Sequence, residues 1–184
     1  MQYCTQIQRH YELQWSVGKR RTWGQGPTNE LPSEFFVLEF PPRDSRNMWT
    51  YATCCMSQRN DINPVEIHLF SDMQDESHVE LLTAIAYYNR TGERLDLAHT
   101  VNFGRPWRPG SECSYGILSL PYLDGPSLEV MRIDGTSKSV RCLWLVPVTL
   151  KEVEFAKRNG MEALEQKFEE CGFDYVEPRR PSVV

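Results

Sequence analysis

The sequence lacks the motifs that mark metal sites and nucleophilic enzymes. It contains no C-x-x-C, H-x-x-x-H or H-E-x-x-H pattern, and the spacing of its six cysteines resembles no zinc ligand pair. It has no G-x-S-x-G elbow, and Gly24 and Gly26 do not extend to the G-x-G-x-x-G of a dinucleotide site. We therefore expect neither a metal nor a cofactor.

Long apolar runs and an excess of positive charge are also missing. The longest apolar stretch, Cys142–Val148, has seven residues, whereas a membrane-spanning helix needs about 18. Residues 1–12 contain no apolar segment of the kind that directs secretion. The net charge is −5, and an acidic chain gains no counterion-release energy from nucleic acid. These absences predict a soluble, cytoplasmic protein that binds neither membranes nor nucleic acid.

The predicted cytoplasmic location determines the expected state of the cysteines. A chain of 184 residues can bury a sufficient core without disulfides, which are rare in the cytoplasm. We expect all six cysteines to be reduced thiols that pack as small apolar side chains. Cys54 and Cys55 are adjacent on a predicted strand, so their side chains should point to opposite faces.

The chain has the composition of one folded domain, with 40% hydrophobic and 24% charged residues. Cys4, Ile7, Tyr11 and Trp15 recur at helical spacing and predict an N-terminal helix. A loop rich in glycine and proline follows. Residues 1–33 are therefore a helix and a loop, which either precede the main domain of residues 34–184 or form part of it.

The remaining periodicity predicts strands alternating with helices. Strands are expected at 35–40, 47–56, 65–70, 97–103, 115–120, 128–133 and 139–147. Capping boxes at Ser77 with Glu80 and at Thr149 with Glu152 begin helices, and Asn159 with Glu162 begins the last one. The pattern predicts an α/β fold of the α+β kind: a mixed, mainly antiparallel sheet with helices packed on it.

An enzyme remains an alternative. Cys55 and His68 lie on neighbouring predicted strands, and with Asp72 they could form a nucleophilic triad. His99 is a further candidate for such a hydrolase. The carboxylate pairs Asp75-Glu76 and Glu169-Glu170 are better explained as solvated charges.

Two stiff aromatic loops favour a protein-binding module instead. Residues 102–110 and 120–126 combine proline with Trp, Arg and Tyr, the side chains that dominate binding hot spots. The first loop could alternatively bind an anion or place Trp107 in the core. The expected partner-binding residues are His99, Asn102, Arg105, Trp107, Tyr122 and Asp124. The competing interpretation is that His99, Asn102 and Asp124 satisfy buried backbone groups.

Several segments in order resemble the bacterial branch of the suppressor of fused family. They are WTYAT at 49–53, HTVNFGRPW at 99–107, SLPYLDGP at 119–126, CLWLVPVT at 142–149, FDY at 173–175, Pro178 and RPSVV at 180–184. The resemblance extends from about residue 34 to the end of the chain. Residues 1–33 contain no motif of the family.

The resemblance implies an α/β fold, no catalysis and a protein partner. Animal members of the family restrain Hedgehog-pathway transcription factors by holding a short strand between two lobes, and this chain resembles the first lobe alone. Bacterial members resemble immunity proteins encoded beside polymorphic toxins. An acidic chain suits capture of a toxin domain that is a basic nuclease. The expected protein is a monomer or a weak homodimer, and a regulatory protein with another partner stays open.

Overall fold

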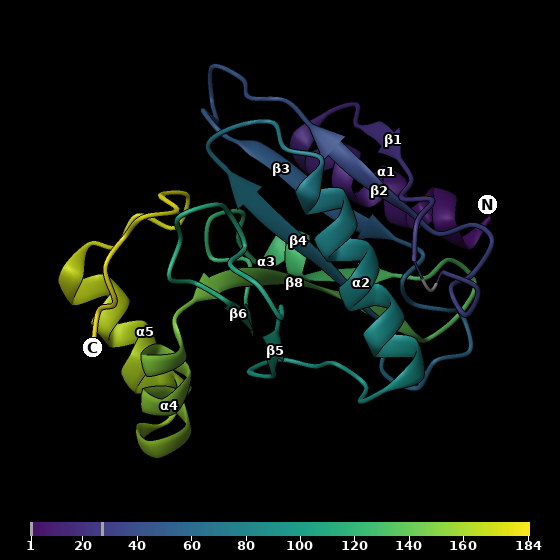
Figure 1. Cartoon of the computed structure of the whole chain (residues 1–184). Coiled ribbons are helices and arrows are strands. Elements are labelled where there is room, and N and C mark those ends of the chain that lie inside the picture. The colour runs from purple at the N-terminus through teal and green to yellow at the C-terminus, as the bar shows by residue number, and fades with distance from the viewer. Residues whose placement is uncertain (1, 27) are drawn as a thin grey trace.

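The structure is a computed structural model that describes residues 2–26 and 28–184. The described residues form one mixed sheet with helices on both of its faces (Figure 1). The strands are β1 (Lys19–Arg21), β2 (Phe36–Phe40), β3 (Trp49–Cys54), β4 (Val65–Ser71), β5 (Thr100–Asn102), β6 (Tyr115–Ser119), β7 (Val130–Arg132) and β8 (Ser139–Val148). The helices are α1 (Tyr3–Trp15), α2 (Ser77–Thr91), α3 (Pro126–Glu129), α4 (Leu150–Asn159) and α5 (Met161–Cys171).

The order of strands in the sheet is β1-β2-β3-β4-β8-β6-β5. β2, β3 and β4 form the antiparallel meander that the sequence predicted. β8 runs parallel to β4 and antiparallel to β6, and its first residues also pair with β7. The predicted hairpin between residues 128–133 and 139–147 is therefore confirmed, and so is the mixed, mainly antiparallel fold class.

Two apolar cores lie on the two faces of this sheet. On one face α1 buries Ile7, Tyr11 and Trp15 in a core that also contains Trp144 of β8. On the other face α2 packs on a separate core, and Figure 1 shows this helix crossing the sheet on the side away from α1. Because both faces are covered, β2 is buried at every position although its sequence alternates.

The helix starts show which capping signals hold. Thr149 and Glu152 form the expected reciprocal capping box at the start of α4. The capping box at Ser77 was wrong, because the backbone is already helical at Glu76 and the Ser77 N–H bonds to Asp75 Oδ1 at 2.9 Å. The start at Asn159 was also wrong: its side chain donates back to Phe155 O, within α4.

The loop expected at residues 17–32 contains the short edge strand β1, which pairs with β2. The short helix α3 had no signal in the sequence analysis. None of the helices formed by residues 2–26 and 28–184 combines the length and apolar character that crossing a bilayer requires. Within the same residues, no cluster of His, Cys, Asp and Glu could hold a metal ion.

Candidate protein-binding groove

A groove of about 410 Å³ lies between β6, β8 and α5. Its floor is made of side chains that are almost completely buried, Trp144, Val146 and Phe168. Its rim carries Tyr122 and Leu123, which are 59% and 42% exposed. The side chains of β8 alternate between the two cores, and those on the α1 side form the floor. After β8 the chain forms α4 and then α5, which supplies one wall.

The C-terminal segment closes the far side of the groove. Gly172 ends α5 in the left-handed conformation, with φ of 56°, and the chain then turns back. Phe173 stacks on Phe168 with ring centroids 4.1 Å apart, and Tyr175 meets Trp144 edge-on at 5.2 Å. Four aromatic rings therefore form a stiff apolar lining, which costs little entropy when a ligand orders it.

A buried ion pair holds that segment in place. Arg180 donates to both carboxylate oxygens of Glu152, at 2.7 and 2.9 Å, and also to Pro147 O. Glu152 accepts from the backbone N–H groups of Thr149 and Val183 as well. Burial alone would raise the pKa of Glu152, but these hydrogen bonds and the charge of Arg180 outweigh it and lower the pKa.

The rim of the groove is acidic. Glu165 accepts hydrogen bonds from Ser119 Oγ at 3.0 Å and Tyr122 Oη at 3.3 Å, and burial and this carboxylate raise the pKa of Tyr122. Residues 161–178 hold six acidic side chains and one basic side chain, Lys167, which pairs with Glu170. Across the described part of the chain, neither Glu165 nor Glu169 is in an ion pair, so both face the groove without a cation.

The six predicted contact residues do not form one surface. Tyr122 lies at the groove and is exposed, as expected. Asp124, two residues later, turns inward: its carboxylate accepts from Trp15 Nε1 at 2.8 Å and pairs with Arg46. Burial raises the pKa of Asp124 despite these two partners. The exposed charged contact expected of Asp124 is therefore occupied inside the protein.

The other four predicted residues lie in and around β5: His99 precedes the strand, Asn102 ends it, and Arg105 and Trp107 lie on the loop that follows. Asn102 accepts from Gly104 N at 2.8 Å, which fixes the loop. Arg105 is exposed and pairs with Glu80 of α2 at 2.7 Å. His99 is half-buried, and its backbone N–H donates to Asp96 O. None of these side chains lines the groove at Tyr122.

Trp107 is 3% exposed, so the surface anchor expected at this position is a core residue. Its ring stacks on His78 at 5.5 Å, and its Nε1 donates to Ser111 Oγ at 3.0 Å. The prolines that stiffen this loop direct Trp107 inward, as the alternative interpretation of the loop held.

Beneath Trp107 lies a serine–histidine pair that sequence reasoning missed. His78 Nε2 is 3.0 Å from Ser71 Oγ, which also accepts from Arg108 Nη1 at 3.3 Å. Both Ser71 and His78 are completely buried, and burial is the main cause that lowers the pKa of His78 to about 4. A hydroxyl enclosed in this way cannot meet a substrate, so the pair holds the loop to the sheet.

The proposed triad of Cys55, His68 and Asp72 is not assembled. Cys55 is bonded to Cys4, and Asp72 accepts from Arg108 at 2.6 Å. His68 is fully buried against aromatic rings, and neither ring nitrogen has a hydrogen-bond partner among the described residues. The hypothesis of a hydrolase built on this triad was therefore wrong, because Cys55 carries no free thiol and His68 is buried beside Trp15 of α1.

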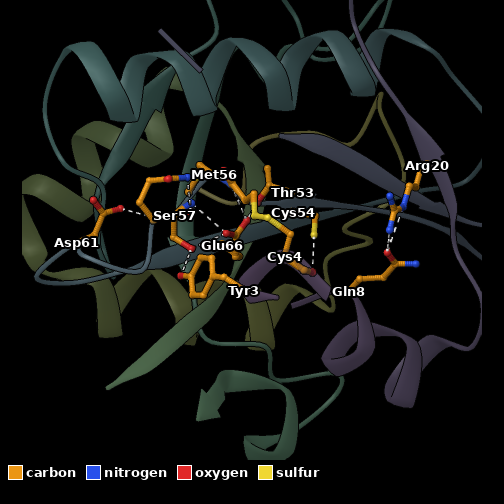
Figure 2. Close-up of a disulfide and its surroundings, with 12 residues drawn as sticks. Tyr3, Cys4, Gln8, Arg20, Thr53, Cys54, Met56, Ser57, Asp61 and Glu66 are labelled. Carbon is orange, nitrogen blue, oxygen red and sulfur yellow. Dashed lines mark hydrogen bonds between the residues drawn. A yellow bond between two sulfur atoms is a disulfide. The ribbon is translucent and has the colours of Figure 1, made fainter. Parts of the chain in front are cut away.

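The disulfide between Cys4 and Cys55 also corrects the expectation that all six cysteines are reduced (Figure 2). Their Cα atoms are 5.4 Å apart, within the usual range for a disulfide. Cys55 has a φ of 67° and follows the last residue of β3, so it leaves the strand and turns toward α1. For the same reason Cys54 and Cys55 share one core instead of pointing to opposite faces.

The sheet with helices on both faces and the groove beside β8 define an α/β protein with an apolar, acidic-rimmed surface site. The chain belongs to the suppressor of fused family, because the family model for "Suppressor of fused protein (SUFU)" matches residues 32–181. No curated protein matches the chain. The family match begins after α1 and β1, which nevertheless pack into the same fold.

Solved structures agree with this assignment. A SUFU homologue from Neisseria gonorrhoeae is 31% identical, with a TM-score of 0.84, and the match covers 99% of this chain and 97% of that one. A chain of the Sufu-Fu complex is 15% identical, with a TM-score of 0.72 and coverage of 98% and 92%. Drosophila Suppressor of Fused is 16% identical, with a TM-score of 0.67; the match covers 98% of this chain and half of that one.

The acidic groove was not found from the sequence. Trp144 was predicted to be a buried strand residue, and Glu169 a solvated charge. One signal was present: acidic side chains and aromatic residues are concentrated between 161 and 178. Its meaning depends on the backbone turning back at Gly172, which places Phe173 and Tyr175 opposite β8.

Proposed function

We propose that the chain is a non-catalytic protein-binding module that acts in the cytoplasm as an immunity protein, neutralising a toxin domain. It would bind a basic segment of that partner in the groove. The observation that carries this proposal is the combination of an aromatic apolar floor with two carboxylates on the rim that lack a cation. An apolar side chain of the partner would fill the floor, and flanking Lys or Arg side chains would pair with Glu165 and Glu169.

The chemistry of the floor supports a peptide segment as the occupant. Trp144 is 5% exposed, and its indole N–H has no hydrogen-bond partner among the described residues. This nitrogen is itself buried, so a bound segment would contact the ring of Trp144 and not its N–H. A fold relative was solved as the Sufu-Fu complex, so this fold is compatible with assembly with another protein.

Co-expression with the product of the neighbouring gene tests the proposal. We expect a stable complex and rescue of growth when that product is a toxin. Glu165→Gln with Glu169→Gln removes both rim charges while keeping hydrogen-bond acceptors, and should weaken binding about ten-fold or more. The control pair Glu30→Gln with Glu93→Gln changes exposed charges outside the groove and should leave binding unaltered. No complex, or equal loss in both pairs, would count against the proposal.

Arg105→Ala examines the second candidate surface, on β5 and its loop. The Arg105–Glu80 pair is about half exposed on both sides, so its loss should cost less than about 1 kcal/mol of stability. If this surface contacts the partner, binding weakens while the melting temperature stays nearly constant. If only the groove contacts the partner, Arg105→Ala binds as the wild type does.

A regulatory interaction protein with a different partner is the second candidate. It has the same groove and differs in the identity of the ligand. The growth assay separates the two: an immunity protein rescues cells from the co-expressed toxin, whereas a regulatory protein binds its partner without rescuing growth.

A further inference from the structure

We infer that the Cys4–Cys55 disulfide is a reversible redox-modification site that controls how tightly α1 holds the loop beside the groove. The regulatory consequence rests on the function proposed for the groove, whereas the disulfide and its mechanical effect do not. Cys55 lies in a rigid turn, whereas Cys4 lies in the uncapped first turn of α1, and the rest of α1 contacts the segment beside the groove.

Cys55 lies in a rigid turn. The turn that contains Cys55 is fixed by the buried carboxylate of Glu66 on β4, as Figure 2 shows. Glu66 accepts from Thr53 Oγ1 at 2.6 Å, from Ser57 N at 2.9 Å and from Ser57 Oγ at 2.6 Å. Cys55 itself is 1% exposed. Reduction of the disulfide leaves the hydrogen bonds of Glu66 in place.

The other half of the bond is weakly held. Cys4 lies in the first turn of α1 and is half-buried. In the described structure Gln2 at the N-cap makes no side-chain cap, and this first turn contains no acidic residue. An uncapped turn frays readily because its N–H groups have no partner in the helix. Tyr3 adds one hydrogen bond, to Ser57 Oγ at 2.7 Å. Tyr3 and Cys4 also pack against the core, and the disulfide is the covalent restraint on this turn.

The rest of α1 runs along the segment that follows the groove residue Tyr122. The contacts recur on successive turns of the helix, so α1 restrains the backbone of residues 124–134. They are Asp134 N to Gln6 Oε1 at 2.9 Å, His10 Nε2 with Leu128 O at 2.8 Å, Gln14 Nε2 to Ser127 Oγ at 2.9 Å and Trp15 Nε1 to Asp124 Oδ1 at 2.8 Å.

Reduction requires an external dithiol, and the geometry selects where it attacks. Its thiolate attacks Sγ of the half-buried Cys4, forms a mixed disulfide and releases Cys55 as a thiolate, which takes up a proton. The second thiol of the reductant then displaces Cys4, so two protein thiols and one oxidised reductant result. Cys54 lies alongside, donating to Cys4 O at 3.3 Å, but burial raises the pKa of its thiol. Cys54 is therefore a poor internal nucleophile, and the pairing stays between Cys4 and Cys55.

The test counts thiols and follows hydrogen exchange in the full chain. In protein purified without reductant, alkylation in denaturant should label four cysteines, Cys54, Cys113, Cys142 and Cys171. After dithiothreitol it should label all six. Reduction should lower the protection of amides in residues 124–134 by ten-fold or more, while amides of α2, on the other face, keep theirs. Reoxidation should restore the protection.

Variants keep the inference falsifiable. Cys4→Ser should show the exchange pattern of the reduced protein without any reductant, and Cys171→Ser, at an exposed free cysteine, should behave as the wild type. The bond closes a separation of 51 residues, so reduction should also lower Tm by roughly 8–16 °C. Six labelled cysteines in protein purified without reductant, or unchanged exchange at 124–134 once the bond is cut, would overturn the inference.

The groove is assessed separately with the partner captured by co-expression. If reduction loosens residues 124–134 and also weakens the complex, both the inference and the proposed function are supported. If the loosening occurs while the Glu165→Gln and Glu169→Gln pair binds normally, the redox site stands and the function proposed for the groove fails.

Discussion

His68 is a histidine without a polar partner, enclosed by rings. It meets Trp15 and Phe70 with centroid distances of 5.2 Å, and neither of its ring nitrogens is hydrogen-bonded among the described residues. Burial, followed by the charge of Arg46, lowers its pKa to about 3. The neutral imidazole therefore acts as a flat apolar side chain, and protonating it inside the core is costly.

This burial predicts a loss of stability in mild acid. The folded pKa of about 3 lies below the ordinary value of 6.5, so the unfolded chain binds the proton first. Stability is fully present above pH 6.5 and declines as the pH falls toward 3, by about 2 kcal/mol at pH 5 from this residue. Urea unfolding of the oxidised protein at pH 7.5, 6 and 5 measures the decline. His68→Phe should reduce the slope by one proton, and an equal slope in wild type and variant would contradict the assignment.

A second residue-scale prediction concerns Arg180. The Arg180 and Glu152 side chains are 5% and 0% exposed, and removing one partner leaves a buried charge. Arg180→Ala should cost roughly 3–5 kcal/mol, a fall in Tm of roughly 6–20 °C. Arg158→Ala is the matched control, because that arginine is 72% exposed and pairs with Glu154 within one helix. The control should change stability by less than about 0.5 kcal/mol; similar losses in both would show that the pair does not hold the C-terminal segment.

At the scale of elements, α1 lies outside the residues that the family model matches, but its side chains are part of the core. It supplies Ile7, Tyr11 and Trp15 to the core on its face of the sheet. Trp15 stacks on Tyr11 at 5.1 Å and meets Phe40 edge-on at 5.2 Å. α1 and β1 thus pack with residues 34–184, and we propose that they belong to one domain with them.

Trp15→Ala should therefore destabilise the whole protein by about 3–5 kcal/mol, since it leaves a large cavity and removes the donor to Asp124. Leu13→Ala in the same helix is the control: Leu13 is 74% exposed, and its loss should change stability by less than about 0.5 kcal/mol. Chemical denaturation followed by circular dichroism measures both. Equal, small effects would mean that α1 is an appendage rather than part of the core.

The elements show what local patterning could predict. The helix at Cys4–Trp15 and the capping box at Thr149 depend on neighbours in sequence, and both are confirmed. β1 has no apolar alternation and forms only because β2 offers an unpaired edge. The disulfide joins residues 51 positions apart, and it depends on the left-handed backbone at Cys55. Neither long-range feature has a local signal in the sequence.

At the scale of the molecule, the candidate site is a product of tertiary structure. Tyr122 was selected from the sequence for its exposed position in a stiff turn, and it lies at the groove. Asp124 and Trp107 were selected by the same reasoning, yet the fold turns both inward, toward Arg46 and His78. Loop composition shows that a segment is stiff, but which side chains face solvent depends on the cores on either side of the sheet.

The distribution of charge over the whole molecule gives the last prediction. The chain carries −5 in total, and residues 161–178, which include one wall of the groove, carry a net −5 of their own. A basic partner should therefore be steered to this end of the molecule, and the association rate should fall steeply as salt screens the field.

Stopped-flow association with the co-expressed partner, between 50 and 500 mM NaCl, measures this dependence. We expect the association rate of the wild type to fall by ten-fold or more, and the rate of the Glu165→Gln and Glu169→Gln pair to fall distinctly less. The dissociation rate should change little with salt, because the apolar floor and not the rim holds the bound segment. A wild-type association rate that is indifferent to salt would mean that the partner binds away from the acidic end, and would favour the β5 loop at Arg105 as the contact surface.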